Sequence, residues 1–242
     1  MRDHPDDGAA PETREAVALA RLETALASHP GRIALVSSFG AESVVLLHML
    51  SRLDPATPVL FGETGMLFAE TLAYQREVAE TLGLTDIRHL RPGPADLAAE
   101  DPDGALHRSD DRACCDIRKV RPLERALAGF DAWITGRKRS QSPGRAALPF
   151  AERDGAGRLK LNPLADWSRR EIAACMDRHA LPRHPLVAKG FPSIGCAPCT
   201  TPVAPGESPR AGRWRGRDRD ECGIHFVGGR AVRVSGAPMD RL

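Results

Sequence analysis

The chain has 242 residues, with 34 lysines and arginines against 32 aspartates and glutamates, which gives a formal net charge of +2. This near equality of positive and negative charges argues against a nucleic-acid binder that depends on bulk positive charge. The composition, 42% hydrophobic and 27% charged, is typical of a globular protein with one substantial core or two small ones. No apolar run approaches the roughly 20 residues that a membrane-spanning helix needs.

The N-terminal segment and the cysteine count bear on the compartment. Residues 1–15 contain several acidic side chains and no apolar stretch of the kind that secretory signals need, so we expect a flexible segment and a cytoplasmic protein. Six cysteines in 242 residues are too few for a disulfide scaffold. In a reducing compartment, clustered cysteines more often bind metal or perform chemistry, so their spacing is informative.

Helical and strand-like patterns alternate along the first half of the chain. Apolar spacing and stop signals predict helices over 16–29, 44–50, 67–82 and 114–127. Short apolar runs predict strands over 33–36, 58–61, 87–90 and 132–135, and residues 159–161 could add an edge strand. Such alternation is typical of an α/β protein with a doubly wound, mostly parallel sheet.

Regular patterns become sparse toward the C-terminus. Ser168 and Glu171 have the spacing of a capping box, which predicts a helix that runs to about residue 179. Residues 181–221 contain seven of the 20 prolines and many arginines, which indicates irregular structure organised by something other than a core. The sequence thus divides into a flexible segment 1–15, an α/β domain 16–205 and a C-terminal tail 206–242 that is flexible.

A turn of small residues follows the first predicted strand. Ser37, Ser38 and Gly40 lie between that strand and the next helix, where free backbone N–H groups and the helix dipole favour an anion such as a phosphate. The basic residues Arg137, Lys138 and Arg139 follow a later strand and would reach the same edge of the sheet. Small residues also serve tight packing at such turns, and this one matches neither the Walker nor the dinucleotide glycine pattern.

Two pairs of cysteines could form one centre. Cys114 and Cys115 are adjacent, and Cys196 and Cys199 follow after 80 intervening residues. Four thiolates hold zinc or an iron–sulfur cluster. Adjacent cysteines point in different directions from one backbone, which suits the corners of a [4Fe–4S] cluster better than a zinc ribbon. The alternative is four unrelated buried cysteines, and the glycine and prolines around the second pair argue against it.

The other two cysteines differ from these pairs and from each other. Cys175 lies among small apolar residues on a predicted helix, where a free cysteine usually only packs. Cys222 follows a dense run of arginines, which lowers the pKa of a thiol and favours a nucleophilic thiolate. The alternatives for Cys222 are a further metal ligand or an idle surface thiol.

Six short segments form a distinctive set. They are SFGAE at 38–42, ETGMLF at 63–68, CCDIRK at 114–119, WITGR at 133–137, GCAPCT at 195–200 and ECGIH at 221–225. In this order they resemble the assimilatory adenylyl-sulfate reductases, and the resemblance covers residues 30–226. The double cysteine, the later CxxC and the ECGIH box are the most specific of the six.

The resemblance implies a sheet of the adenine-nucleotide alpha-hydrolase type and an enzyme that reduces adenosine 5′-phosphosulfate to sulfite and AMP. It implies a [4Fe–4S] cluster on Cys114, Cys115, Cys196 and Cys199, a catalytic Cys222, and thioredoxin or glutaredoxin as reductant. The substrate-binding positions that it implies are Ser37, Ser38 and Gly40 along the phosphosulfate, Glu63, Thr64 and Gly65 near the adenosine, Lys119 between cluster and substrate, and Arg137, Arg139, Arg145, Arg210, Arg213 and His225 around the sulfate and phosphate. A homo-oligomer is compatible with the sequence, and no nucleic-acid or membrane partner is implied.

Thiol chemistry accounts for this reaction. A Cys222 thiolate that attacks the sulfur while AMP departs yields a thiosulfonate, and a second thiol then expels sulfite. The cluster need not transfer electrons. We expect it to order the segments that hold it and, through Lys119, to shape the electric field at the sulfate.

Three alternatives stay open. A reductase for the 3′-phosphorylated substrate shares the ECGIH chemistry but generally lacks the cluster cysteines, and use of both substrates fits the sequence as well. An ATP pyrophosphatase would use a related sheet, but its turn typically reads SGGxDS where this chain has SSFGAES. A metal-stabilised binding module would explain four ligands but not Cys222 in a chain with a nucleotide turn.

Overall fold

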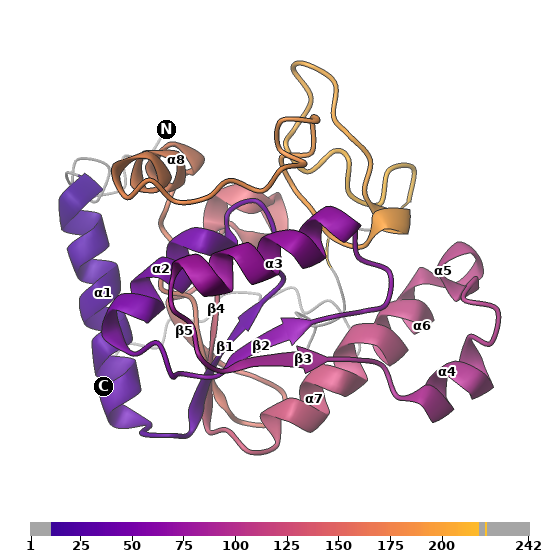
Figure 1. Ribbon diagram of the computed structural model, residues 1–242, viewed down its shortest axis with the longest axis horizontal. Coiled ribbons are helices and arrows are strands. Elements are labelled where there is room, and N and C mark those ends of the chain that lie inside the picture. The colour runs from indigo at the N-terminus through magenta and orange to yellow at the C-terminus, as the bar shows by residue number, and fades with distance from the viewer. Residues whose placement is uncertain (1–10, 218–220, 222–242) are drawn as a thin grey trace.

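The computed structural model describes residues 11–217 and 221, and the structural statements below concern these residues. A six-stranded sheet with strand order β3-β2-β1-β4-β6-β5 forms the centre of the molecule (Figure 1). The strands are β1 (Ile33–Ser37), β2 (Val59–Gly62), β3 (Ile87–Leu90), β4 (Ala132–Thr135), β5 (Ala151–Arg153) and β6 (Leu159–Leu161). All neighbours pair in parallel except β5, which is antiparallel to β6. The predicted α/β class with a mostly parallel sheet is confirmed.

Helices cover both faces of the sheet. The four on one face are α1 (Pro11–Ser28), α2 (Ser43–Leu53), α3 (Ala69–Thr81) and α8 (Arg169–Arg178), and α7 (Arg121–Leu127) packs on the other (Figure 1). Strand residues alternate between the two cores, because successive side chains of a strand point to opposite faces. In β1, Ile33 and Leu35 join the larger core, whereas Ala34 joins the smaller one with Leu123 and Leu127.

The cysteine pair 114–115 lies in an interrupted helix. Short helices α4 (Pro94–Glu100) and α5 (Leu106–Ser109) precede α6 (Asp111–Cys115), and a π-helical turn, η1 (Asp116–Val120), joins α6 to α7. Asp110 caps α6 by accepting hydrogen bonds from the backbone N–H groups of Arg112 and Ala113. Pro122 has no N–H to donate to the preceding turn, which accounts for a change in the hydrogen-bond ladder here. Such π turns often mark functional sites.

The structure corrects three boundaries. Helix α1 begins at Pro11, five residues before the predicted start, and Glu15 is buried, so residues 11–15 are not a flexible segment. Strand β6 is not the edge strand, because the unpredicted β5 pairs with its outer side. Residues 206–217 pack as part of the fold rather than as a flexible tail, since residues Thr200 and Arg213 form a β-bridge and Trp214 is 3% exposed.

The remaining elements are three single 3₁₀ turns, which are η2 (Arg139–Gln141), η3 (Pro143–Arg145) and η4 (Ala197–Cys199). The capping box predicted at Ser168 and Glu171 is present at the start of α8. None of the helices in the described part of the chain is long and apolar enough to span a membrane.

Candidate functional site

A cavity of about 330 Å³ opens at the carboxyl edge of the sheet. Its wall combines the ends of β1, β2 and β4 with the turn into α2, the segment after β4, and two parts of the chain near residues 192–196 and 208–214. Ligands bind at this edge in open parallel sheets, and the volume falls in the range of small-molecule sites. The predicted substrate-binding residues that line it are Ser37, Ser38, Gly40, Thr64, Lys119, Arg137, Arg145, Arg210 and Arg213.

The turn between β1 and α2 is closely packed. Phe39 has a left-handed backbone with a φ of 47°, and its N–H donates to Ser37 Oγ over 3.1 Å. The buried Phe39 ring packs edge-on against Phe61 at 5.1 Å, which fixes the turn against β2. A Cβ on Gly40 would lie 3.4 Å from the Ile194 carbonyl oxygen, so the turn and the segment at Ile194 lie close together. The turn therefore brings its small residues and the start of α2 to the cavity wall.

Buried charges surround the cavity on the β4 side. Lys138 is 1% exposed, and its ammonium contacts the Glu42 carboxylate at 2.9 Å. Burial outweighs this attraction and holds the pKa of Lys138 below its usual value. Arg137 is also buried, donates to Asn162 Oδ1 and pairs with Glu152, and burial likewise lowers its pKa.

A second basic group comes from Arg145, Arg210 and Arg213. The Arg145 guanidinium pairs with both carboxylate oxygens of Glu221 and with Gln141. Arg210 lies 4.0 Å from the same carboxylate, and Arg213 donates to the Ile194 carbonyl oxygen over 3.2 Å. Glu221 itself lines the cavity.

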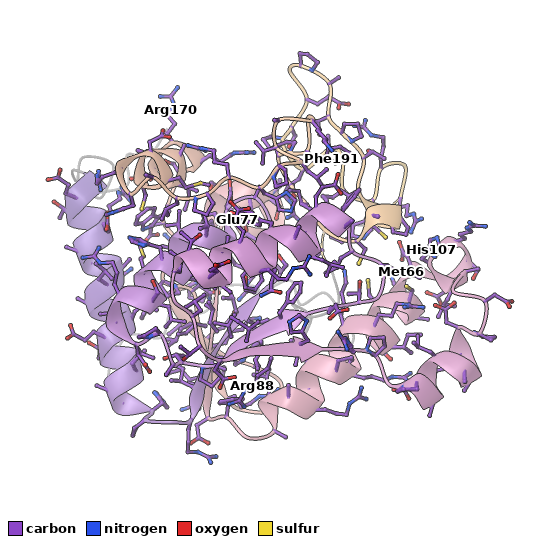
Figure 2. All side chains as sticks on the ribbon, in the orientation of Figure 1. Met66, Glu77, Arg88, His107, Arg170 and Phe191 are labelled. Carbon is purple, nitrogen blue, oxygen red and sulfur yellow. The ribbon has the colours of Figure 1, made fainter. Side chains whose placement is uncertain are left out.

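The four paired cysteines come together beside this cavity. Cys114 and Cys115 lie at the end of α6, Cys196 directly precedes η4, Cys199 is its last residue, and all four are free thiols. Figure 2 shows sulfur atoms beside the labelled Met66, where α6 and η4 meet. The Met66 carbonyl oxygen accepts from the Ala197 N–H over 2.8 Å, which holds the second pair against the loop after β2.

The surroundings of Cys196 and of Cys114 shift the two thiol pKa values in opposite directions. Burial raises the pKa of Cys196, but the Lys119 ammonium, hydrogen bonds from Thr64 and Lys119, and Arg213 together hold it below the usual value. The Thr64 hydroxyl lies 3.2 Å from Cys196 Sγ. Burial and the neighbouring thiols, Cys115 first, raise the pKa of Cys114 to about 11. Four thiols gathered in one place fit a four-thiolate metal centre, because a bound metal displaces the thiol protons. The positive charges of Lys119 and Arg213 favour the thiolate form of Cys196.

Three predicted residues do not line the cavity. Glu63 points to His89 and Arg91, with contacts of 2.7 and 2.9 Å. Gly65 supplies a positive φ in the loop after β2, and Arg139 pairs with Asp166 outside the cavity wall. Cys222 and His225 lie outside the described residues.

Sequence reasoning missed several side chains of the cavity wall. They are Glu42, Gln141, Arg169, Trp214 and Glu221. Four of these five lie within two residues of a predicted site position, so the available signal was their nearness in sequence to Gly40, Arg139, Arg213 and Cys222. Arg169 alone lies at the start of α8, and its approach to Glu42 is a tertiary contact.

A separate group of ligand-type side chains lies between α1 and α8. Ligand atoms of Glu15, Cys175 and His179 lie within 4.8 Å of one another. The Glu15 carboxylate already pairs with Arg52, Arg178 and His179, so side chains of the protein serve as its partners. Cys175 is 2% exposed and packs in the larger core, as predicted.

The family comparison and the curated relatives place this chain in one family. A family described as the phosphoadenosine phosphosulfate reductase domain matches residues 32–202. An adenosine 5′-phosphosulfate reductase of Mesorhizobium japonicum is 54% identical over 81% of this chain and 77% of its own length. A phosphoadenosine 5′-phosphosulfate reductase of Gloeobacter violaceus is 42% identical over 80% of this chain and 82% of its own. The crystal structure of a phosphoadenylyl-sulfate reductase from Candida auris is similar with a TM-score of 0.66, at 25% identity over 83% of this chain and 99% of the other.

Proposed function

Because this chain belongs to the phosphoadenosine phosphosulfate reductase domain family, an oxidoreductase family that acts on sulfur compounds, we propose that it reduces adenosine 5′-phosphosulfate to sulfite and AMP. The reaction would serve sulfate assimilation for cysteine biosynthesis. The observation that supports it most is one cavity that joins a serine turn, buried arginines and Cys196. The residue before Cys222 lines the same cavity.

The charges of the cavity suit the two ends of this substrate. We assign the phosphosulfate to the side of Arg145 and Arg210, because guanidinium groups bind such oxyanions through paired hydrogen bonds. The phosphosulfate continues along Ser37 and Ser38, where the start of α2 favours its negative charge, and the adenosine extends toward Thr64. Lys119 lies between this space and the cysteines, since it lines the cavity and lowers the pKa of Cys196.

Cys222 is the proposed nucleophile. Its thiolate forms a bond to the sulfur of the sulfate group while the bond from that sulfur to the AMP oxygen breaks, and AMP leaves with the electron pair. A thiolate of thioredoxin or glutaredoxin then attacks the Cys222 sulfur and expels sulfite, which leaves a mixed disulfide. A second thiol of the reductant resolves this disulfide. Two thiols are oxidised, and the sulfur gains two electrons.

We infer that Cys114, Cys115, Cys196 and Cys199 hold a [4Fe–4S] cluster. The fit rests on the four buried or half-buried thiols and on Lys119 and Thr64 beside Cys196. When bound, the cluster supplies a fixed charge distribution beside the substrate. Lys119 holds positive charge between the cysteines and the cavity, which favours an anionic substrate there. Such thiols must stay reduced, which favours a cytoplasmic location.

The 3′-phosphorylated nucleotide is the second candidate substrate. The relative from Gloeobacter violaceus is named for that substrate at 42% identity. A cavity with this many arginines could also neutralise one more phosphate. The two candidates predict the same thiosulfonate on Cys222, so the choice of nucleotide separates them.

The direct test is anaerobic incubation of the protein with adenosine 5′-phosphosulfate and no thiol, followed by peptide mass spectrometry. We expect one added SO₃ group on Cys222 and none in the Cys222→Ser variant, which should keep its iron. Sulfite release from Cys222→Ser would contradict the mechanism. An adduct only with the 3′-phosphorylated nucleotide would move the assignment to that substrate, and no adduct with either would point to a different adenylated ligand.

The cluster assignment has its own test. Cys196→Ser should lose most of the iron and acid-labile sulfide measured in purified protein. Cys175→Ser is the matched control, because Cys175 is an equally buried cysteine in the helical layer formed by α1, α2 and α8. Equal iron content in both variants would reject the assigned ligands, and zinc in place of iron would identify the other four-thiolate centre.

A further inference from the structure

The Glu221 side chain occupies the basic end of the cavity. One carboxylate oxygen accepts from Arg145 Nη2 over 2.6 Å and the other pairs with Arg145 Nε, while Arg210 lies 4.0 Å away. The side chains of Glu221, Arg145 and Arg210 are 13%, 9% and 19% exposed. This two-pronged contact is the geometry by which a guanidinium recognises a planar carboxylate or the edge of a phosphate.

Among the described residues, two carboxylates line the cavity, and they have different partners. Glu42 precedes α2 and pairs with the fully buried Lys138, so it belongs to the fixed charge balance of the turn. Glu221 instead pairs with the guanidinium that a phosphosulfate would use. A ligand anion and the Glu221 carboxylate cannot both take these hydrogen-bond donors of Arg145, and like charges at such distances repel strongly in a buried site.

We propose that Glu221 is an internal competitor for the anionic part of the ligand, a role that rests on the proposed function of this site. In the ligand-free protein the carboxylate satisfies Arg145, and a phosphate or sulfate group gains the same contacts only by displacing it. The ligand affinity measured in solution is then the intrinsic affinity multiplied by the fraction of molecules in which Glu221 does not occupy Arg145. Glu221 is thus a determinant of affinity that adjoins the proposed nucleophile in sequence.

Binding of AMP and of inorganic phosphate, measured by calorimetry on the cluster-loaded protein, tests this role without turnover. Glu221→Gln removes the competing charge and keeps the size of the side chain, so AMP should bind at least fivefold more tightly. Glu221→Asp keeps the charge, and its affinity for AMP should stay within about twofold of the unaltered protein, because it restores the competitor.

A charge-matched control separates competition from a general electrostatic effect. Glu207→Gln removes one negative charge beside Arg215, and neither residue lines the cavity. If both glutamine variants bind AMP more tightly to the same extent, the gain comes from net charge and the competitor role is wrong.

The outcomes also separate this role from the proposed function. If the unaltered protein binds neither AMP nor phosphate, the function assigned to the cavity fails. If it binds AMP and Glu221→Gln binds with equal or lower affinity, the function stands and the competitor role is overturned. Tighter binding in Glu221→Gln alone supports the competitor role.

Discussion

His184 shows how one buried residue fixes its own protonation state. The Leu186 N–H donates to His184 Nδ1 over 3.2 Å, so Nε2 carries the proton and donates to Thr71 Oγ1 over 3.0 Å. The ring is 1% exposed and packs against Tyr74 at 4.7 Å. Burial lowers the pKa of His184 to about 4, against a small opposing effect of Glu70. A second proton would break the bond from Leu186.

This protonation state predicts acid sensitivity. Between pH 6.5 and 4 the unfolded chain binds a proton at this histidine and the folded chain does not, so stability falls as the pH decreases through that window. The loss should be about 1–3 kcal/mol in the free energy of unfolding, measured by urea titration at pH 7 and pH 4.5. His184→Gln should be less stable at pH 7 and lose less on acidification. His29→Gln, which alters a half-buried histidine just after α1, should keep the slope of the unaltered protein, and an unchanged slope in His184→Gln would contradict the assignment.

Gly212 is a second position where one atom matters. A Cβ there would overlap the Thr201 carbonyl oxygen, while the Gly212 carbonyl oxygen accepts from the Thr201 N–H over 2.8 Å. Gly212→Ala should push these two segments apart and displace Arg210 and Arg213. We expect AMP to bind at least fivefold more weakly in calorimetry. Gly129→Ala, where a Cβ meets nothing within 4 Å, is the control, and equal affinity in the two variants would show that the loop tolerates the shift.

At the scale of elements, one carboxylate joins three helices. Glu15 of α1 accepts from Arg52 in α2 at 3.0 Å, from Arg178 in α8 at 2.8 Å, and pairs with His179 at 2.8 Å. Burial raises the pKa of Glu15, but the bonds and charges of His179 and Arg178 outweigh it and hold the pKa below the usual value. The stabilisation is therefore present above the pKa of the unfolded chain and is lost as the pH falls through the lower pKa of the folded state.

Glu15→Gln should destabilise the protein by about 1–3 kcal/mol, because it leaves three cationic or polar partners without their acceptor. The change is measured as a lower urea midpoint at pH 7. Glu23→Gln alters an exposed residue of the same helix and should shift stability by less than about 0.5 kcal/mol. AMP binding should be unchanged in both, because neither residue lines the cavity. Equal midpoints for the two variants would reject a role of Glu15 in joining the helices.

The elements also show what the sequence could predict. Strands β1, β2, β3 and β4 are apolar runs between clear breakers, and their alternation with helices predicted that they pair in parallel. Strand β5 has the sequence AER and two exposed residues, so no apolar pattern announced it, and its pairing with β6 is a tertiary contact. Pro11 at the first position of α1 is a helix-start signal that the nearby acidic residues obscured. The π turn at 116–120 depends on hydrogen bonds that periodicity does not encode.

The candidate site likewise contains residues that the sequence could predict and contacts that it could not. The residues of the β1–α2 turn and the two cysteine pairs were predictable because motif spacing and topology bring them to one edge of the sheet. The partners of Glu42 and Glu221 were not, since contacts such as Lys138 to Glu42 and Arg145 to Glu221 join segments almost 100 and 76 residues apart through the fold. Glu63, which the resemblance places near the adenosine, does not line the cavity, because His89 and Arg91 hold it at the β3 side.

At the scale of the whole molecule, the segment 192–217 depends on few links to the sheet. Its backbone contacts include the bridge from Leu67 to Cys196 and the bond from the Ala197 N–H to Met66, while the bridge from Thr200 to Arg213 lies within the segment. Neither hydrophobic core cluster contains a residue of this segment, so the cores contribute few side chains to holding it in place. A group bound to Cys114, Cys115, Cys196 and Cys199 would therefore cross-link the segment to α6 across 80 intervening residues.

Removal of that group should loosen the segment and leave the sheet intact. We expect anaerobic chelation of iron to speed tryptic cleavage after Arg210, Arg213, Arg215 and Arg217 at least tenfold, because local opening exposes these bonds without global unfolding. Circular dichroism should change little, since the helices and strands outside the segment keep their packing. Cys175→Ser, which spares the proposed ligands, should cleave like the unaltered protein before chelation. Equal cleavage rates with and without iron would mean that the protein's own contacts order the segment, and the cross-linking role would then fall even if iron is present.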